Sequence, residues 1–146
     1  MRTIFKILAL PIGLIASAAA AAGTPEQVVG HHVAMMKKGD LAAIMRDYAP
    51  DTVVLAPPGL VRGQSDKKPG VFVGASARKV FATLTDKDHH PGVRTMETRI
   101  VPGGPGIARL RWTQFKGTPR QVTGEDIFVV RGGRISYQAI LVDPAR

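Results

Sequence analysis

The chain contains no cysteine, so it has no disulfide, no thiolate nucleophile and no cysteine metal ligand. Its four histidines form two adjacent pairs, His31-His32 and His89-His90. Neither pair has the spacing of metal ligands, and no H-E-x-x-H pattern accompanies them. The motif G-x-S-x-G is also absent. These absences argue against a metal site and against a hydrolase-type nucleophile.

Aromatic residues are scarce at 5% of the chain, whereas Lys and Arg are in excess and give a net charge of +9. The basic residues are scattered in ones and twos, which is typical of a solvated surface and not of a nucleic-acid interface. Contact with an anionic surface is a weaker alternative. The glycine-rich segment 103–106 lacks the Lys-Ser/Thr of a phosphate loop. We therefore expect neither nucleic acid nor a cofactor.

The N-terminus has the pattern of a secretory signal peptide. Arg2 and Lys6 precede an apolar run, Ile7–Ala22, which ends in small residues before Gly23. A transmembrane anchor is the alternative. However, the run has only 16 residues, including a proline and a glycine, and a spanning helix needs about 20 apolar residues. We predict a cleaved signal over residues 1–22, a domain over 23–146 without membrane insertion, and a periplasmic or secreted protein.

Three helices are predicted in the first part of the domain. The first follows a Thr24 cap and a Pro25 start and ends at Gly39, where glycine suits a left-handed cap. Asp40 caps a second, short helix, which the spacing of Leu41, Ile44 and Tyr48 extends to Pro50. A third helix is expected between Val71 and Leu84.

Strands dominate the rest. A hairpin is predicted around the Pro57-Pro58-Gly59 turn, with strands 52–56 and 60–62, and four further strands cover 93–101, 107–115, 121–130 and 134–142. Helices followed by successive strands indicate an α+β fold, with one curved antiparallel sheet and the three helices on one face.

Two segments, KKGDLAAIMRDYAPDTVVLAPPGLVRG and GEDIFVVRGGRISYQAILVD, carry a resemblance. In these segments and in its predicted order of helices and strands, the chain resembles the nuclear transport factor 2-like superfamily. Within it, the chain is most similar to the SnoaL-like and ketosteroid-isomerase-like branch. The resemblance implies a cone-shaped, cystatin-like α+β fold that encloses a pocket, often in a homodimer.

The isomerases of that superfamily use a carboxylate base together with a tyrosine and a protonated aspartic acid as oxyanion hole. Matched position by position, the base falls on Ala56, the tyrosine on His32 and the acid on Asp126. Because Ala56 cannot take a proton, the resemblance does not extend to isomerase chemistry of that kind.

Asp126 is the first candidate for acid–base chemistry. Strand alternation places it inward with Phe128 and Val130, where burial among apolar side chains raises a carboxyl pKa. The SnoaL-like cyclases that the chain resembles use an acid on this strand as general base. Alternatively, Asp126 pairs with a buried arginine or belongs to a structural hydrogen-bond network.

His32 is the second candidate, as an acid–base or orienting partner paired with Asp126; a surface position beside His31 is the alternative. Four further residues are predicted to line the pocket, with core packing as the alternative: Tyr48, Ala56, Trp112 and Phe128.

Three functions remain open. The first is an exported domain that binds a small apolar or aromatic ligand. The second is a cofactor-free cyclase, dehydratase or isomerase that uses Asp126 and His32. The third is a non-catalytic protein-interaction module. A homodimer is compatible with all three.

Overall fold

A computed structural model of the chain describes residues 23–144, so the predicted signal peptide lies outside the described residues. The elements in chain order are α1 (Pro25–Lys38), α2 (Leu41–Arg46), β1 (Tyr48–Ala56), β2 (Gly70–Val73), the 3-10 helix η1 (Gly74–Ala77), α3 (Arg78–Thr85), α4 (Gly92–Thr95), β3 (Glu97–Gly104), β4 (Ile107–Gln114), β5 (Val122–Arg131) and β6 (Arg134–Val142). In this part of the chain, no helix combines the length and the apolar character that crossing a bilayer requires.

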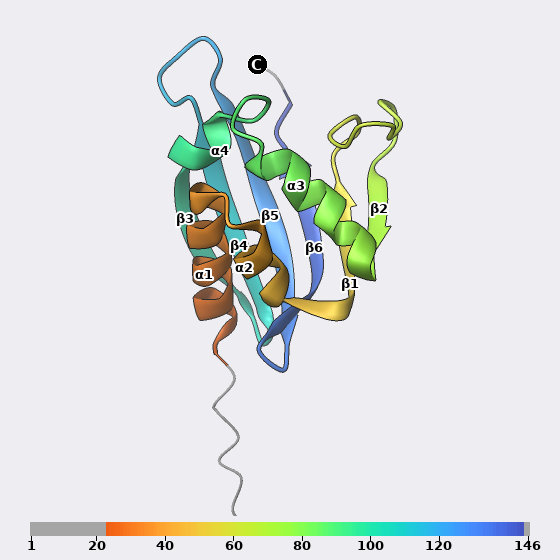
Figure 1. Cartoon of the computed structure of the whole chain (residues 1–146). Helices are drawn as coiled ribbons and strands as arrows, with labels where there is room; N and C mark the ends of the chain where they lie inside the picture. The colour runs from red at the N-terminus through yellow and green to blue at the C-terminus, as the bar shows by residue number, and fades with distance from the viewer. Residues whose placement is uncertain (1–22, 145–146) are drawn as a thin grey trace, which may run out of the picture.

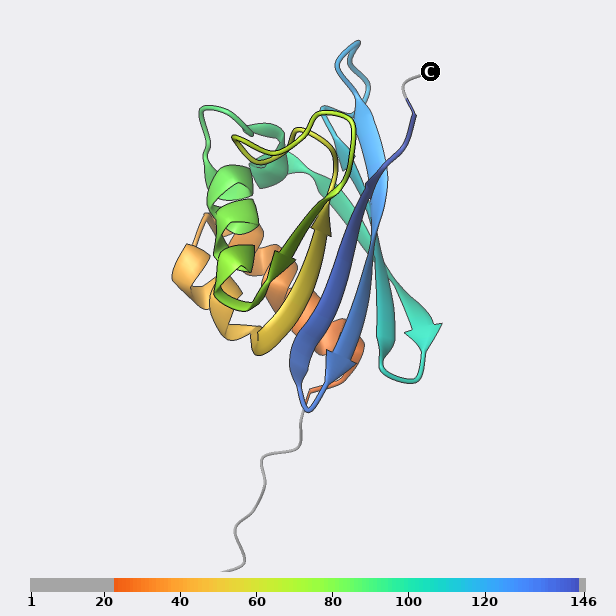
Figure 2. The same cartoon turned by 90° about the vertical axis from the view of Figure 1, so that its right-hand side faces the viewer.

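The six strands form one curved, unclosed sheet in the order β2-β1-β6-β5-β4-β3. The helices cover one face of this sheet, and the other face carries no helix (Figure 1, Figure 2). This confirms the α+β class. The sheet is not wholly antiparallel, however, because β1 pairs with β6 in parallel. The chain reaches β6 only after the β3–β5 meander, which brings the two strands side by side in the same direction.

Helix α1 begins and ends as its sequence predicts. The Thr24 side chain accepts a hydrogen bond from the Gln27 backbone, and the Gln27 side chain accepts one from the Thr24 backbone. This capping box satisfies two of the free N–H groups of the first turn. At the other end, Gly39 adopts φ 74°, which glycine tolerates without strain.

The second predicted helix is too long. Helix α2 ends at Arg46, and Tyr48 begins strand β1. Pro50 lies inside this strand, in the stretch between Tyr48 and Val53 where the register with β6 shifts. A proline has no N–H for a sheet ladder, but an irregular stretch does not require one. The helical spacing of Tyr48 is therefore overridden by tertiary pairing.

The predicted hairpin at Pro57-Pro58-Gly59 is also wrong in its second strand. Residues 60–62 are not a strand, and the partner of β1 is β2, with Val54 opposite Phe72. The intervening loop closes on itself, since Gly59 N–H donates to Ser65 O at 2.8 Å.

The third helix lies within the window predicted for it, to within one residue: Val71 belongs to β2, and α3 runs from Arg78 to Thr85, after η1. The start of the next strand differs from the prediction. Val93 lies in the short helix α4, and β3 starts at Glu97. The strands β4, β5 and β6 lie within one residue of their predicted bounds.

The core lies between the helices and the inner face of the sheet. It contains fully buried side chains from both layers, among them Val29, Ile44, Phe81, Phe128 and Ile135. On the outer face, Val71, Val73 and Leu141 are exposed by 64%, 56% and 48%.

Candidate functional site

A cavity of about 260 Å³ lies between the helices and the inner face of β4, β5 and β6. Most of its wall is apolar, and the polar side chains in it are His32, His90, Gln114, Asp126 and Gln138. Val122 and Val142 also line the cavity, from the start of β5 and the end of β6, and are themselves 38% and 47% exposed.

Asp126 is the carboxyl group of the cavity wall. Alternation along β5 turns it inward, where it is 7% exposed. Trp112 Nε1 donates to Oδ1 and Gln138 Nε2 donates to Oδ2, both at 2.8 Å. The pKa of Asp126 is raised to about 7, mainly by burial. The hydrogen bonds from Trp112 and Gln138 act in the opposite direction and reduce this rise, and the charge of Glu125 adds a smaller increase. The group therefore changes charge near neutral pH.

Tyr48 and Gln138 connect Asp126 to His32. The Tyr48 hydroxyl donates to Gln138 Oε1, and its oxygen lies 3.4 Å from His32 Nδ1. The His32 ring also packs edge-on against the rings of Tyr48, Phe81 and Phe128. Burial, and secondarily the charge of His31, lowers the pKa of His32 to about 3. His32 is consequently a neutral imidazole at physiological pH.

The direct pair predicted between His32 and Asp126 does not form. Both residues line the cavity, but two side chains separate them in the hydrogen-bond chain. A buried arginine partner for Asp126 is not found among the described residues either. Arg109 and Arg111 lie on the opposite face of the sheet, where their Nε atoms are 3.2 and 3.6 Å from the Glu125 carboxylate.

Of the four residues predicted to line the cavity, Trp112 is part of its wall. Tyr48, Ala56 and Phe128 are 3%, 1% and 0% exposed and lie in the core behind the wall. At the end of β1 the wall is formed by Pro57 instead. Chain segment 56–57 thus offers the cavity no carboxylate.

No protein-family model matches the chain, and no curated protein does. Solved structures match over most of its length. IdmH, a proposed polyketide cyclase from Streptomyces antibioticus, is 19% identical with a TM-score of 0.59, covering 83% of this chain and 93% of its own. An NTF-2-like protein of unknown function from Burkholderia xenovorans is 18% identical with a TM-score of 0.58, covering 83% and 84%. A protein with a cystatin-like fold from Methylobium petroleophilum is 17% identical with a TM-score of 0.54, covering 83% and 76%.

The chain has the nuclear transport factor 2-like fold. The wall of the cavity in this nuclear transport factor 2-like domain also contains residues that the sequence analysis above does not predict. Gln138 is the only polar side chain between Tyr137 and Val142 in an otherwise apolar stretch, and its alternation with Ile140 points it to the same face. That pattern was a signal for an inward polar residue.

His90 also lines the cavity, a position that no pattern in the sequence predicts. Burial lowers its pKa, the charge of His89 adds to this effect, and Asp86 opposes it. Within residues 23–144, no three His, Cys, Asp or Glu side chains are grouped as a metal site requires.

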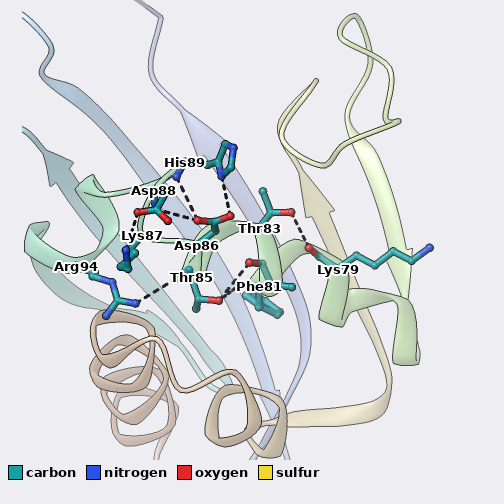
Figure 3. Close-up of polar contacts among 10 residues, drawn as sticks. Lys79, Phe81, Thr83, Thr85, Asp86, Lys87, Asp88, His89 and Arg94 are labelled. Carbon is teal, nitrogen blue, oxygen red and sulfur yellow. Dashed lines mark hydrogen bonds and ion pairs between the residues drawn. The ribbon is translucent and has the colours of Figure 1, made fainter.

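The segment between α3 and α4 that carries His90 is held by its own polar contacts (Figure 3). The Asp86 carboxylate binds His89 Nδ1 at 2.8 Å and accepts from the His89 backbone at 3.4 Å. Arg94 donates to the carbonyl of Thr85 at 3.4 Å, which ties α4 to the end of α3. These contacts place His90 at a defined position in the cavity wall.

Proposed function

We propose that the cavity binds a small apolar or aromatic molecule and that Asp126 contacts a polar group of this ligand. The observation that carries the proposal is a buried carboxyl, hydrogen-bonded on both oxygens, in a cavity whose wall is otherwise mainly apolar. Cavities of this kind bind ligands through apolar contact and use a few polar groups for orientation. The SnoaL-like branch of the fold and a location outside the cytoplasm are parts of the same proposal.

Acid–base catalysis is the second candidate function. A carboxyl with a pKa of about 7 gives and takes protons readily at neutral pH. IdmH, with the same fold, is a proposed polyketide cyclase. For this chain, Asp126 would exchange the proton without a cofactor, and neutral His32 would orient the substrate. Because residue 56 is alanine, a second carboxylate base on β1 has no place in such a mechanism.

Native mass spectrometry of gently purified protein tests the binding function. The expected result is a small-molecule adduct that is reduced in Asp126→Asn and unchanged in Glu125→Gln. Glu125 is the neighbouring carboxylate on the opposite face of β5 and does not line the cavity. At pH 8 or above, where its effect on the pKa of Asp126 leaves that carboxyl ionised in both proteins, Glu125→Gln controls for the loss of a charge. An adduct that both variants retain equally would place the ligand elsewhere.

The outer face of the sheet supports an additional proposal, a homodimer. Val71 and Val73 on β2 and Leu141 on β6 are exposed, and no helix of the described chain covers them. Exposed apolar side chains on one face favour association. A non-catalytic interaction module would use this face as well. The two cavity functions, ligand binding and catalysis, predict ligand binding that changes as Asp126 titrates. An interaction module that uses the outer face of the sheet does not predict this.

A further inference from the structure

The hydrogen-bond chain from His32 to Asp126 has a direction. An ionised carboxylate only accepts hydrogen bonds, so Gln138 must turn its amide N–H toward Asp126 and its carbonyl oxygen toward Tyr48. The single proton of Tyr48 then goes to Gln138 Oε1. The Tyr48 oxygen is left as an acceptor for His32 Nδ1. A neutral imidazole has one N–H, so this proton sits on Nδ1.

His32 Nε2 then carries no proton and has a free lone pair. It has no hydrogen-bond partner within residues 23–144, and His32 belongs to the cavity wall. With Asp126 ionised, the ring nitrogen available to a ligand is therefore an acceptor. This conclusion depends on Tyr48 and Gln138, which lie between the two residues and do not themselves titrate at neutral pH.

We propose that Gln138 and Tyr48 are positioning residues that couple the protonation of Asp126 to the tautomer of His32. When Asp126 takes up one proton, its O–H donates to Gln138 Oε1 after the amide turns over. Gln138 N–H then donates to Tyr48, and the Tyr48 O–H donates to His32 Nδ1. The imidazole keeps one proton throughout: the proton on Nδ1 is lost to solvent while another binds Nε2.

His32 Nε2 is consequently an acceptor above the titration of Asp126 and a donor below it. For the binding function proposed above, on which this consequence rests, the cavity would favour a phenol or enol in the first state. It would favour a ketone in the second. The tautomer itself does not depend on any ligand.

Few other charged groups lie near the hydrogen bonds that connect His32 to Asp126. His90 is the remaining titratable group in the cavity wall, and no titratable group of α2 or α3 lines the cavity. Glu125 follows the opposite face of β5 with Arg109 and Arg111, and its charge shifts Asp126 in the same direction as burial. His31 is half-exposed and bound to Asp47. Because burial holds the pKa of His32 near 3, this ring responds by changing tautomer and not by charging.

Nitrogen-15 NMR of the His32 ring tests the proposal on the protein without ligand. Trp112 is the single tryptophan, so its indole N–H signal reports the titration of Asp126 in the same sample. We expect Nδ1–H above this titration and Nε2–H below it. A His32 tautomer that stays constant while the Trp112 signal titrates would overturn the proposal.

Three variants sharpen this test. In Asp126→Asn, Trp112 N–H fixes the amide oxygen toward itself, so the amide N–H faces Gln138 and His32 should be Nε2–H at every pH. In Gln138→Met and Tyr48→Phe the chain is broken, and the tautomer should no longer follow Asp126. A tautomer change that persists in Gln138→Met would contradict the coupling, and agreement between both broken-chain variants excludes a local packing effect.

Binding of two matched probes then separates this inference from the proposed function. We expect the preference for 1-naphthol over 1-tetralone to fall by up to about tenfold as Asp126 is protonated, the amount that one hydrogen bond contributes. If neither probe binds but the tautomer still switches, the proposed ligand is wrong and the coupling stands. If the probes bind and the tautomer does not switch, the coupling is wrong and the binding function stands.

Discussion

Gly124 lies directly opposite Trp112 across β4 and β5, and the indole ring occupies the space where a side chain of residue 124 would be. A Cβ atom there would overlap both the Trp112 ring and the carbonyl oxygen of Leu141. The missing side chain thus allows Trp112 to lie along the sheet and reach Asp126. The glycine before the Glu125-Asp126 pair is part of the cavity's construction.

Gly124→Ala should therefore destabilise the fold by roughly 1–3 kcal/mol, as overpacking does, and should move the Trp112 indole N–H signal. Gly30→Ala is the matched control, because Gly30 lies inside α1 and a methyl group added there would meet only Ile100, at 3.7 Å. That variant should gain roughly 0.5–1 kcal/mol from helix propensity. Urea unfolding measures both; a Gly124→Ala protein as stable as the wild type with an unmoved Trp112 signal would refute the packing argument.

Trp112→Phe should raise the pKa of Asp126 above its value of about 7, because the indole N–H stabilises the charged carboxylate. Glu125→Gln should act in the opposite direction, since the Glu125 charge contributes to the rise. Carbon-13 NMR of the Asp126 carboxyl across pH 5 to 9 measures both shifts. Equal pKa values in the two variants would show that burial alone sets the titration.

The dependence of stability on pH should separate Asp126 from His32. The Asp126 pKa rises from 3.8 to about 7 on folding, so the folded state binds more protons in this window and stability falls as pH rises through it. The cost is complete above pH 7 and amounts to roughly 4 kcal/mol. The His32 pKa falls from 6.5 to about 3, so its contribution is lost as pH falls below 6.5. The two trends oppose each other in the wild type.

Asp126→Asn removes the first trend and leaves the second. The free energy of unfolding of this variant should rise steadily relative to that of the wild type as pH increases from 4 to 7.5. In absolute terms it should fall as pH decreases below 6.5, because the His32 trend remains. Urea unfolding at four or five pH values gives the comparison. Parallel curves for the two proteins would mean that Asp126 has the same pKa folded and unfolded.

The sequence predicted the fold class because its strongest local signals agree with the tertiary structure. The Thr24 cap, the Gly39 end and the alternation along β4 to β6 all appear as expected. Residues 48–50 were predicted as the end of a helix because the parallel partner that makes them part of β1 lies 80 to 90 residues away in the chain. No local pattern in TVVLAPPG indicates that its neighbour is β6.

The site was predictable in part. Alternation alone turned Asp126 inward, and the fold resemblance placed His32 in the same cavity. The hydrogen bonds that connect these two residues through Tyr48 and Gln138 were not predictable. The spacing of Tyr48 favours a helix, and the residues around Gln138 do not indicate which side chain it contacts. Only the parallel pairing of β1 with β6 brings these two side chains together.

The homodimer proposal predicts a mass of two chains in analytical ultracentrifugation. Val73→Lys and Leu141→Lys should give monomers, because each puts a charge among the exposed apolar side chains of β2 and β6. Ala82→Lys, an exposed position on α3, should remain dimeric and controls for the added charge. A wild-type protein that is monomeric at high micromolar concentration would rule out this interface.

The most direct measurement of cavity binding is a titration with 1-naphthol, followed through the Trp112 indole N–H signal. We predict a saturable shift in the wild type and in Leu141→Phe, and none in Val142→Phe. The two substitutions are adjacent on β6, but only Val142 lines the cavity. Saturation in Val142→Phe equal to that of the wild type, or no shift in any of the three proteins, would contradict the account.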